Sequence, residues 1–338
     1  MVVIDGSSGE GGGQILRTAL AVAMVTGQPF RIKDIRAKRK KPGLLRSHLA
    51  VIDVAAQLCS AGFDGTGLGS SQLTFFPGDV VPGQYKFSVP ATVAASLVLE
   101  TLLPVLCLAK GESTVVIEGG FNNAATPPAE FLAKTYLPQI SKMGPTTKLR
   151  LESAPELPLG VGRFVLTVEP TVRFKAISLM DRGVPMQKSA SRALTGLGGH
   201  RKADEVDALE RTLGMAKQSL KGDPQLRTSK VMLEMSYESI TEVFTAFGKA
   251  GQTNEALAAE AAKQAKRYME SPAAVCEFLA DQLLLPMALA GSGSMSTTRV
   301  SPHARANMDT IRAFLGVEFW TDPLGKNAAM IEVKQSPM

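Results

Sequence analysis

The chain has 338 residues, of which 45% are hydrophobic and 20% charged, and its net charge is +6. This composition excludes a wholly disordered protein, and the length suits two domains or one large domain with an insert. Aromatic residues make up 6%, which argues against the class of proteins that bind RNA mainly through a base-stacking sheet. Between Arg31 and Arg46 eight lysines and arginines accompany one acid, Asp34, so this stretch either attracts phosphate or forms a solvated basic face.

The three cysteines, Cys59, Cys107 and Cys276, lie far apart in apolar surroundings and lack the spacing of metal ligands. They are expected to be buried, reduced thiols rather than nucleophiles or zinc ligands. The first residues show no basic segment followed by an apolar one, so no signal peptide is expected. The most apolar stretch, 93–109, carries a glutamate and a proline and predicts a buried helix rather than a membrane span. We therefore expect a cytoplasmic protein without a membrane partner.

A glycine-rich loop at residues 6–13 leads into an apolar helix that ends near Gly27. A β-rich run follows it and ends in the basic stretch. The later helices are expected, in chain order, at 44–58, 93–109, 131–140, 202–218, 254–271 and 308–315, with strands at 230–238 and 242–250.

Three segments share one pattern, in which an apolar helical run, a glycine and a β-rich run follow each other. The glycines are Gly27, Gly111 and Gly293, which lie 84 and 182 residues apart. The tripeptide Leu-Leu-Pro occurs at 102–104 and again at 284–286, which supports the pairing of the second and third segments. The sequence therefore predicts three repeats, with an insert before the third.

The expected fold class is α/β, as an α+β sandwich of three similar modules. The insert is expected at residues 178–268 and should form a second, smaller α/β domain. The large domain would then comprise residues 1–177 and 269–338.

The first motif that suggests chemistry is the loop GSSGEGGGQILR at 6–17. Glycines let backbone N–H groups approach a ligand closely, and a helix N-terminus favours anions. Neither a Walker A loop nor a dinucleotide-binding glycine pattern fits this spacing, and a plain tight turn would explain the glycines alone. Glu10 could hold Mg²⁺ beside phosphates, and Arg17 could reach the same ligand.

The three stretches that follow the repeat strands hold most of the remaining unusual residues, and one of them contains His303. His303 is expected in a loop, between Ser301-Pro302 and Arg305. No second histidine or cysteine lies at ligand spacing, which argues against a metal role. A neutral imidazole can attack phosphorus, and a nearby arginine can stabilise the charge that develops.

Five segments together resemble the RNA 3′-terminal phosphate cyclase family over nearly the full chain. They are EGGGQILR (10–17), RAKRKKPGLLRSHL (36–49), PPAEFL (127–132), EFLADQLLLPMALAG (277–291) and the stretch around His303. The resemblance implies three βαβαββ modules similar to the C-terminal domain of translation initiation factor 3, plus a smaller α/β insert. It also implies a cytoplasmic ligase of RNA processing that uses ATP with Mg²⁺ or Mn²⁺ and acts on RNA with a 3′-phosphate end.

The resemblance further implies three steps: transfer of AMP from ATP to His303, transfer of that AMP to the RNA 3′-phosphate, and closure of a 2′,3′-cyclic phosphodiester with release of AMP. Carried over residue by residue, His303 is the catalytic nucleophile and Glu10 the metal ligand. The phosphate-binding residues are Arg17, Arg36 and Arg39. The ATP-binding residues are Glu100, Pro127, Phe278, Leu279, Ala280, Asp281 and Gln282.

Several positions depart from the family pattern, and two of them replace a polar side chain. Glu100 and Ser47 each stand where a glutamine is usual. A carboxylate accepts hydrogen bonds and repels phosphate, whereas an amide can donate, so the affinity for ATP or the choice of nucleotide is expected to differ.

Three other interpretations stay open. The first is a non-catalytic, cyclase-like RNA-binding protein, against which the joint presence of Glu10, Arg17 and His303 argues. The second is an enolpyruvyl transferase, a class usually built from more modules and without a covalent histidine. The third is a plain RNA-binding module that uses the basic stretch. The sequence leaves the oligomeric state open, and an oligomer is possible.

Overall fold

The computed structural model describes residues 1–9, 11–120, 126–153, 161–193, 216–217, 230–248, 252 and 254–336. Glu10 therefore lies outside the described residues. So does nearly all of the helix expected at 202–218, of which the described pair Ala216–Lys217 forms a short strand, β11.

Three units of the chain each contribute a four-stranded sheet and the helices that cover it. The first unit consists of β1 (Val2–Asp5), α1 (Gly13–Thr26), β2 (Phe30–Lys33), α2 (Arg46–Cys59), β3 (Gly62–Asp64) and β4 (Leu73–Phe76). The second consists of β5 (Gln84–Ser88), α3 (Ala95–Cys107), β6 (Ser113–Gly120), α4 (Ala129–Phe131), the π-helical turn η1 (Leu132–Tyr136), α5 (Leu137–Lys142), β7 (Thr146–Ser153) and β8 (Val161–Glu169). The third consists of β9 (Ser178–Leu179), α8 (Glu277–Ala290), β14 (Ser292–Thr297), α9 (Pro302–Phe314), β15 (Val317–Pro323) and β16 (Ala329–Gln335).

The three sheets share one strand order and one pairing sense. Their orders are β1-β2-β4-β3, β5-β6-β8-β7 and β9-β14-β16-β15. In each sheet the first two strands are parallel and the other neighbours are antiparallel. The Leu-Leu-Pro tripeptides lie at the same position of α3 and of α8, counted from the helix start. Each unit therefore presents a helix at the same place relative to its sheet.

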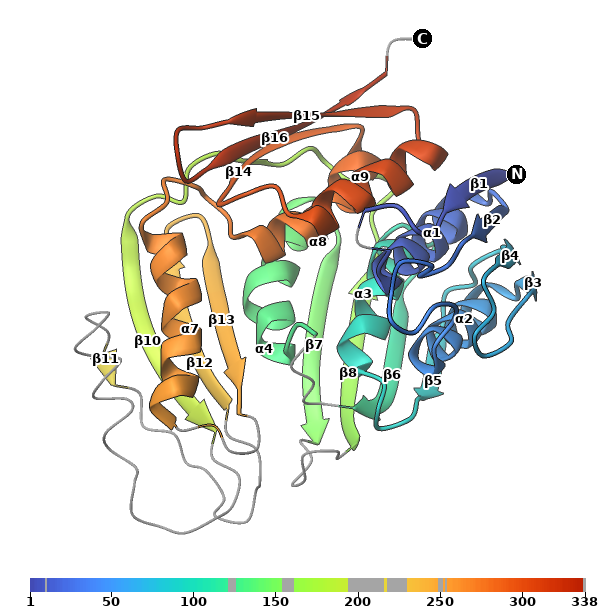
Figure 1. Cartoon of the computed structure of the whole chain (residues 1–338), viewed down its shortest axis with the longest axis horizontal. Helices are drawn as coiled ribbons and strands as arrows, with labels where there is room; N and C mark the ends of the chain where they lie inside the picture. Colours follow the sequence, from blue (N-terminus) through green and yellow to red (C-terminus); the bar gives the residue numbers. More distant parts are fainter. Residues whose placement is uncertain are drawn as a thin grey trace.

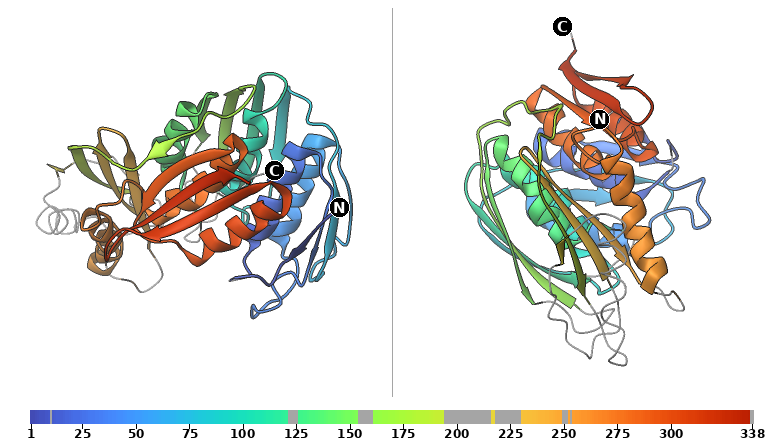
Figure 2. Two further views of the ribbon diagram at one scale, coloured as in Figure 1. Left: turned by 90° about the horizontal axis from the view of Figure 1, so that it is seen from above. Right: turned by 90° about the vertical axis from the view of Figure 1, so that its left-hand side faces the viewer.

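The helices gather in the interior and the three sheets lie outside them (Figures 1 and 2). Helix α1 packs against α2, α3 and α9, and α8 packs against α3 and α9. The apolar faces of these helices form the core, because burying them removes most of their apolar surface from water. Among the described residues, no helix combines the length and the apolar character that crossing a bilayer requires.

The fourth sheet has the order β11-β10-β12-β13 and is covered by α7. Its further elements are β10 (Pro185–Ala193), β12 (Lys230–Tyr237), β13 (Thr241–Phe247) and α7 (Asn254–Met269). These elements fall within the stretch 178–268 expected for the insert, apart from the last residue of α7. Strand β9 at the start of that stretch pairs with β14 of the third unit. The division into a large and a small domain stays a prediction.

Most of the expected elements that can be compared are confirmed. Helices α2, α3 and α7 and strands β12 and β13 lie where the sequence predicts them, and all three cysteines are buried free thiols. The expected start of the last helix near Met308 is wrong, because α9 begins at Pro302. The Ser301 hydroxyl accepts the N–H of Ala304, and Pro302 takes the first helical position, where its missing N–H has no consequence.

A fully buried carboxyl group joins the fourth sheet to the start of α8. Glu242 on β13 accepts a hydrogen bond from the backbone N–H of Cys276, over 2.6 Å through its Oε1. Its other oxygen, Oε2, is buried and has no hydrogen-bond partner among the described residues. Burial raises the pKa of Glu242 to about 7, although its bonds to Cys276 and the charge of Arg182 act in the opposite direction.

Replacing Glu242 with glutamine should change how stability depends on pH. The folded protein holds the Glu242 proton up to about pH 7, whereas the unfolded chain releases it near 4.5. The free energy of unfolding of the wild type, relative to Glu242→Gln, should therefore fall by on the order of 3 kcal/mol as pH rises through this window. Urea unfolding at pH 5 and pH 8 measures the effect. The same difference between the two proteins at both pH values would contradict it.

Candidate active site

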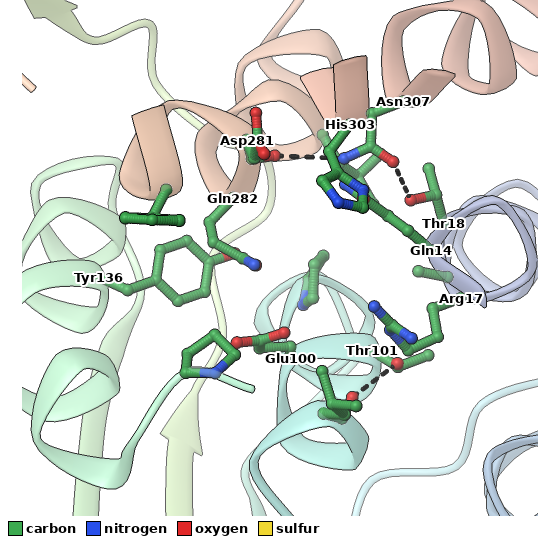
Figure 3. A pocket seen from close by; sticks show the side chains of 16 residues that line it. Gln14, Arg17, Thr18, Glu100, Thr101, Tyr136, Asp281, Gln282, His303 and Asn307 are labelled. Atoms are coloured by element: carbon green, nitrogen blue, oxygen red, sulfur yellow. Dashed lines mark hydrogen bonds between the residues drawn. The ribbon is translucent and has the colours of Figure 1, made fainter. Parts of the chain in front are cut away.

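A cavity of about 240 Å³ opens where the interior helices of the three units meet (Figure 3). Helices α1, α3, α8 and α9, the turn η1 and the segment before α4 all contribute side chains to its wall. The cavity brings together residues that lie up to about 290 positions apart in the chain. The residues predicted from the sequence that line it are Arg17, Glu100, Pro127, Phe278, Asp281, Gln282 and His303.

Four other predicted residues do not line this cavity. Leu279 and Ala280 are buried in the core at 0% and 1% exposure, on the part of α8 that faces away from the cavity. Arg36 and Arg39 belong to the loop beside the N-terminus of α1, next to the cavity. The assignment of these residues to nucleotide and phosphate binding stays a prediction.

The glycine loop brings backbone close to the site at the start of α1. Gly9 and Gly11 have positive φ values of 54° and 57°, which glycine adopts without strain. Gly12 is the N-cap of α1 and has no side chain to occupy the helix N-terminus. A Cβ added at Gly12 would lie 3.8 Å from Arg39 and from the Cε1 atom of His303, so the helix start lies close to both side chains. At Gly13 an added Cβ would lie 2.3 Å from His48 Nε2, and only glycine fits there.

His48 is a buried, neutral residue that lies beside the arginines at this helix start. Its Nδ1 accepts the backbone N–H of Leu45 over 3.1 Å, so the proton of the neutral ring is on Nε2, beside Gly13. Burial, together with the charges of Arg17 and Arg36, lowers the pKa of His48 to about 4. No local pattern in the sequence singles out this position, because a single histidine on a helix carries no signal for its surroundings.

The basic loop before α2 holds its arginines in a constrained backbone. Arg36 has a φ of 56°, which is uncommon outside glycine, and its N–H donates to the carbonyl of Gly6 in the glycine loop. Its guanidinium donates to the carbonyl of Lys41. Burial and the charge of Arg39 lower the pKa of Arg36, which indicates that the two guanidinium groups lie near each other. Such a pair of like charges favours a bound anion.

His303 lies in the first turn of α9 and faces the cavity (Figure 3). The prediction that it lies in a loop is therefore wrong, and the cap at Ser301 is the physical reason. The Ser301 hydroxyl lies 2.8 and 2.9 Å from the two carboxylate oxygens of Asp281 and accepts the N–H of Ala304. Asp281 on α8 thus fixes the start of the helix that carries His303.

Glu100, Arg17 and Gln282 form the polar floor of the cavity. The Gln282 side chain hydrogen-bonds to the Glu100 carboxyl group. The Arg17 guanidinium makes no hydrogen bond or ion pair with any described residue, although it lines the cavity. Burial lowers the pKa of Arg17, and the nearby Glu100 opposes this shift. A charged arginine that lacks partners within a cavity is suited to bind an anion.

Nine of the sixteen lining residues were not predicted from the sequence, and Gln14, Thr18, Tyr136 and Asn307 are four of them. Gln14 follows the glycines of the first motif, and Tyr136 lies on η1. The Thr18 hydroxyl donates to Asn307 Oδ1 over 2.7 Å and joins α1 to α9. The Asn307 amide also donates to the carbonyl of Asp281. No local pattern reveals a bond between residues 289 positions apart.

The described part of the chain contains no group of three or more histidine, cysteine or acidic side chains that could hold a metal ion. It therefore offers no complete protein cage for a metal. Mg²⁺ is commonly held by one or two carboxylates together with substrate phosphates and needs no such cage. A site with a single carboxylate ligand is therefore compatible with Mg²⁺. Glu10 remains the predicted ligand.

In this α/β fold one arginine and one histidine face the same cavity, and two further arginines lie in the loop beside it. Such side chains are suited to bind and transfer phosphoryl groups. Residues 8–321 match the family model for RNA 3′-terminal phosphate cyclase. The chain belongs to the RNA 3′-terminal phosphate cyclase family.

Individual relatives agree with this assignment. The chain is 48% identical over 323 residues to the RNA 3′-terminal phosphate cyclase of Koribacter versatilis, which covers 94% of this chain and 91% of the relative. It is 40% identical over 322 residues to the enzyme of that name from Salmonella enteritidis, covering 94% and 95% of the two chains. Among solved structures, the enolpyruvyl transferase NikO from Streptomyces tendae matches with a TM-score of 0.40 and 13% identity, over 98% of this chain and 48% of that one.

Proposed function

We propose that this protein is an ATP-dependent ligase that converts an RNA 3′-terminal phosphate into a 2′,3′-cyclic phosphodiester through a covalent histidine–AMP intermediate. The observation that carries the proposal is the placement of His303 and Arg17 in one cavity beside a cluster of cations at the start of α1. The cavity is the proposed site of ATP. The two cations Arg36 and Arg39, with the neutral His48 beside them, form the proposed site of the RNA 3′-phosphate.

In the first step a ring nitrogen of His303 attacks the α-phosphorus of ATP. A phosphorus–nitrogen bond forms, the bond to the bridging oxygen breaks, and pyrophosphate leaves. Arg17 would neutralise the charge that develops on the phosphoryl oxygens. Asp281 and Ser301 would keep the imidazole in place, because they fix the first turn of α9.

In the second step an oxygen of the RNA 3′-phosphate attacks the AMP phosphorus, and the bond to His303 breaks. The product is an RNA whose 3′-phosphate carries AMP. In the third step the neighbouring 2′-hydroxyl attacks the 3′-phosphorus and loses its proton, and AMP leaves. This ring closure gains from proximity, because the hydroxyl is already held beside the phosphorus.

The proposal also includes a metal ion and a cellular location. Mg²⁺, or Mn²⁺ in its place, would be held by Glu10 and would offset phosphate charge when bound. The three buried free thiols fit a reducing compartment, which supports a cytoplasmic location.

The direct test is an end-group assay. An RNA oligonucleotide with a 3′-phosphate is incubated with the protein, ATP and Mg²⁺. We expect the product to resist phosphatase and to lose the mass of one water. A matched oligonucleotide with a 2′-deoxy terminal nucleotide should accept AMP and accumulate in that form, because it lacks the hydroxyl that closes the ring. RNA binding with steep salt dependence and no turnover would overturn the proposal in favour of a non-catalytic RNA-binding relative.

A further inference from the structure

Glu100 is an acid in an unusual place for a protein that binds polyphosphate. It lies in the middle of α3, a helix that is otherwise almost entirely apolar and buried. One side of the residue lines the nucleotide cavity. The other side borders a small apolar pocket, whose wall includes Leu103, Leu132 and Leu149.

The surroundings of Glu100 favour its neutral form. Its Oε1 atom is buried and has no hydrogen-bond partner among the described residues, so a charge on this oxygen would lack solvation. Burial raises the pKa of Glu100 to about 7, although the charge of Arg17 and the hydrogen bond from Gln282 act in the opposite direction. At neutral pH the free protein therefore contains both forms of this group.

The groups that face Glu100 come from four elements. Arg17 on α1 is the cation that stabilises its charged form. Tyr136 on η1 stays a neutral phenol, because burial raises its pKa well above the ordinary value. Asp281 on α8 and His303 on α9 line the same cavity. Asp281 is held by Ser301 and adds negative charge to the cavity.

A bound nucleotide shifts this balance toward the neutral acid. Its phosphates would engage Arg17 and offset the charge of the cation that supports the carboxylate among the described residues. They would also add negative charge nearby. A carboxylate can only accept hydrogen bonds and would repel a phosphate oxygen. A neutral carboxyl group can donate a hydrogen bond to that oxygen.

We propose that Glu100 binds the nucleotide as a neutral carboxylic acid whose hydroxyl donates a hydrogen bond to a phosphate oxygen beside Arg17. Nucleotide binding then takes up a proton from solvent whenever Glu100 is ionised in the free protein. This inference rests on the proposed ATP-binding function of the cavity.

The test is titration calorimetry with α,β-methylene ATP, which cannot transfer AMP because its α–β bridge does not break. Binding is measured with Mg²⁺ at pH 8 in several buffers of different ionisation enthalpy, for the wild type and for Glu100→Gln. We expect the wild type to take up close to one proton more per nucleotide than Glu100→Gln. Above pH 7 the wild type should bind more weakly relative to Glu100→Gln. The dissociation constant of the wild type, divided by that of Glu100→Gln, should rise by up to about tenfold per pH unit.

A matched control is Glu242→Gln, which neutralises a second buried acid with a raised pKa outside the cavity. It should take up protons as the wild type does. Equal proton uptake by the wild type and Glu100→Gln, with both bound, would overturn the role of Glu100 and leave the proposed function standing. Failure of the analogue to bind the folded wild type would overturn the proposed function itself. If Glu100→Gln melts far below the wild type, binding is measured as a function of pH for the wild type and for Glu242→Gln instead. We expect the affinity of both proteins to fall above pH 7, after correction for the titration of the free nucleotide. An affinity that does not fall would overturn the proposal.

Discussion

Replacing His303 with alanine is expected to abolish ATP-dependent cyclisation, with a loss on the order of 10⁴-fold or more. No lysine or cysteine lines the cavity among the described residues. Tyr136 is kept as a neutral phenol by burial, and the Asp281 carboxylate is held by Ser301. Among the described residues that line the cavity, the imidazole is therefore the side chain best suited to attack phosphorus. Conversion of a 3′-phosphorylated oligonucleotide to a phosphatase-resistant product measures the loss.

The same variant offers an internal control. An oligonucleotide whose 3′-phosphate already carries AMP needs no histidine nucleophile, because only ring closure and the departure of AMP remain. His303→Ala should therefore still cyclise this substrate. Cyclisation of the ordinary 3′-phosphate with ATP by His303→Ala, at a rate near that of the wild type, would contradict the proposed role of His303.

Replacing Arg17 with alanine is expected to have the second largest effect. The Arg17 guanidinium makes no hydrogen bond or ion pair with the described residues, and burial lowers its pKa, so a bound phosphate would be its main partner. Binding of α,β-methylene ATP should weaken by about 100-fold. Lysine at this position should recover the affinity only in part, because it lacks the planar fork of donors. Calorimetric titration measures both variants.

Arg150→Ala is the matched control for this prediction. Arg150 is exposed, pairs with Glu152 at the surface and is not among the residues that line the cavity. The variant removes the same charge from the protein and should bind the nucleotide as the wild type does. Binding by Arg17→Ala that equals binding by Arg150→Ala would contradict the role of Arg17.

Local patterns in the sequence were sufficient to predict the helices and strands whose buried residues are continuous or periodic along the chain. The apolar run that forms α3, the alanine-rich α7 and the strands β12 and β13 all lie where they were expected. Each of these patterns depends only on residues that are close in the sequence. It can therefore be recognised without knowledge of the fold. The motif residues Arg17, Glu100 and His303 also meet in one cavity, although the motifs lie far apart in the sequence.

Features that depend on tertiary contacts could not be predicted from local patterns. The N-cap at Ser301 depends on Asp281 of another helix, and this bond explains why His303 lies in a helix rather than in a loop. Leu279 and Ala280 share a motif with Asp281, but the 3.6-residue period of α8 turns them into the core. The place of His48 beside Gly13 depends on the packing of α2 against α1.

The central claim is that His303 carries AMP during the reaction. The most direct measurement mixes the protein with Mg²⁺ and ATP labelled at the α-phosphate, and separates the products on a denaturing gel beside His303→Ala. We predict a labelled protein band that resists alkali, is lost in acid and is absent from the variant. A folded wild type that gains no label, or a variant that gains as much label as the wild type, would contradict the account.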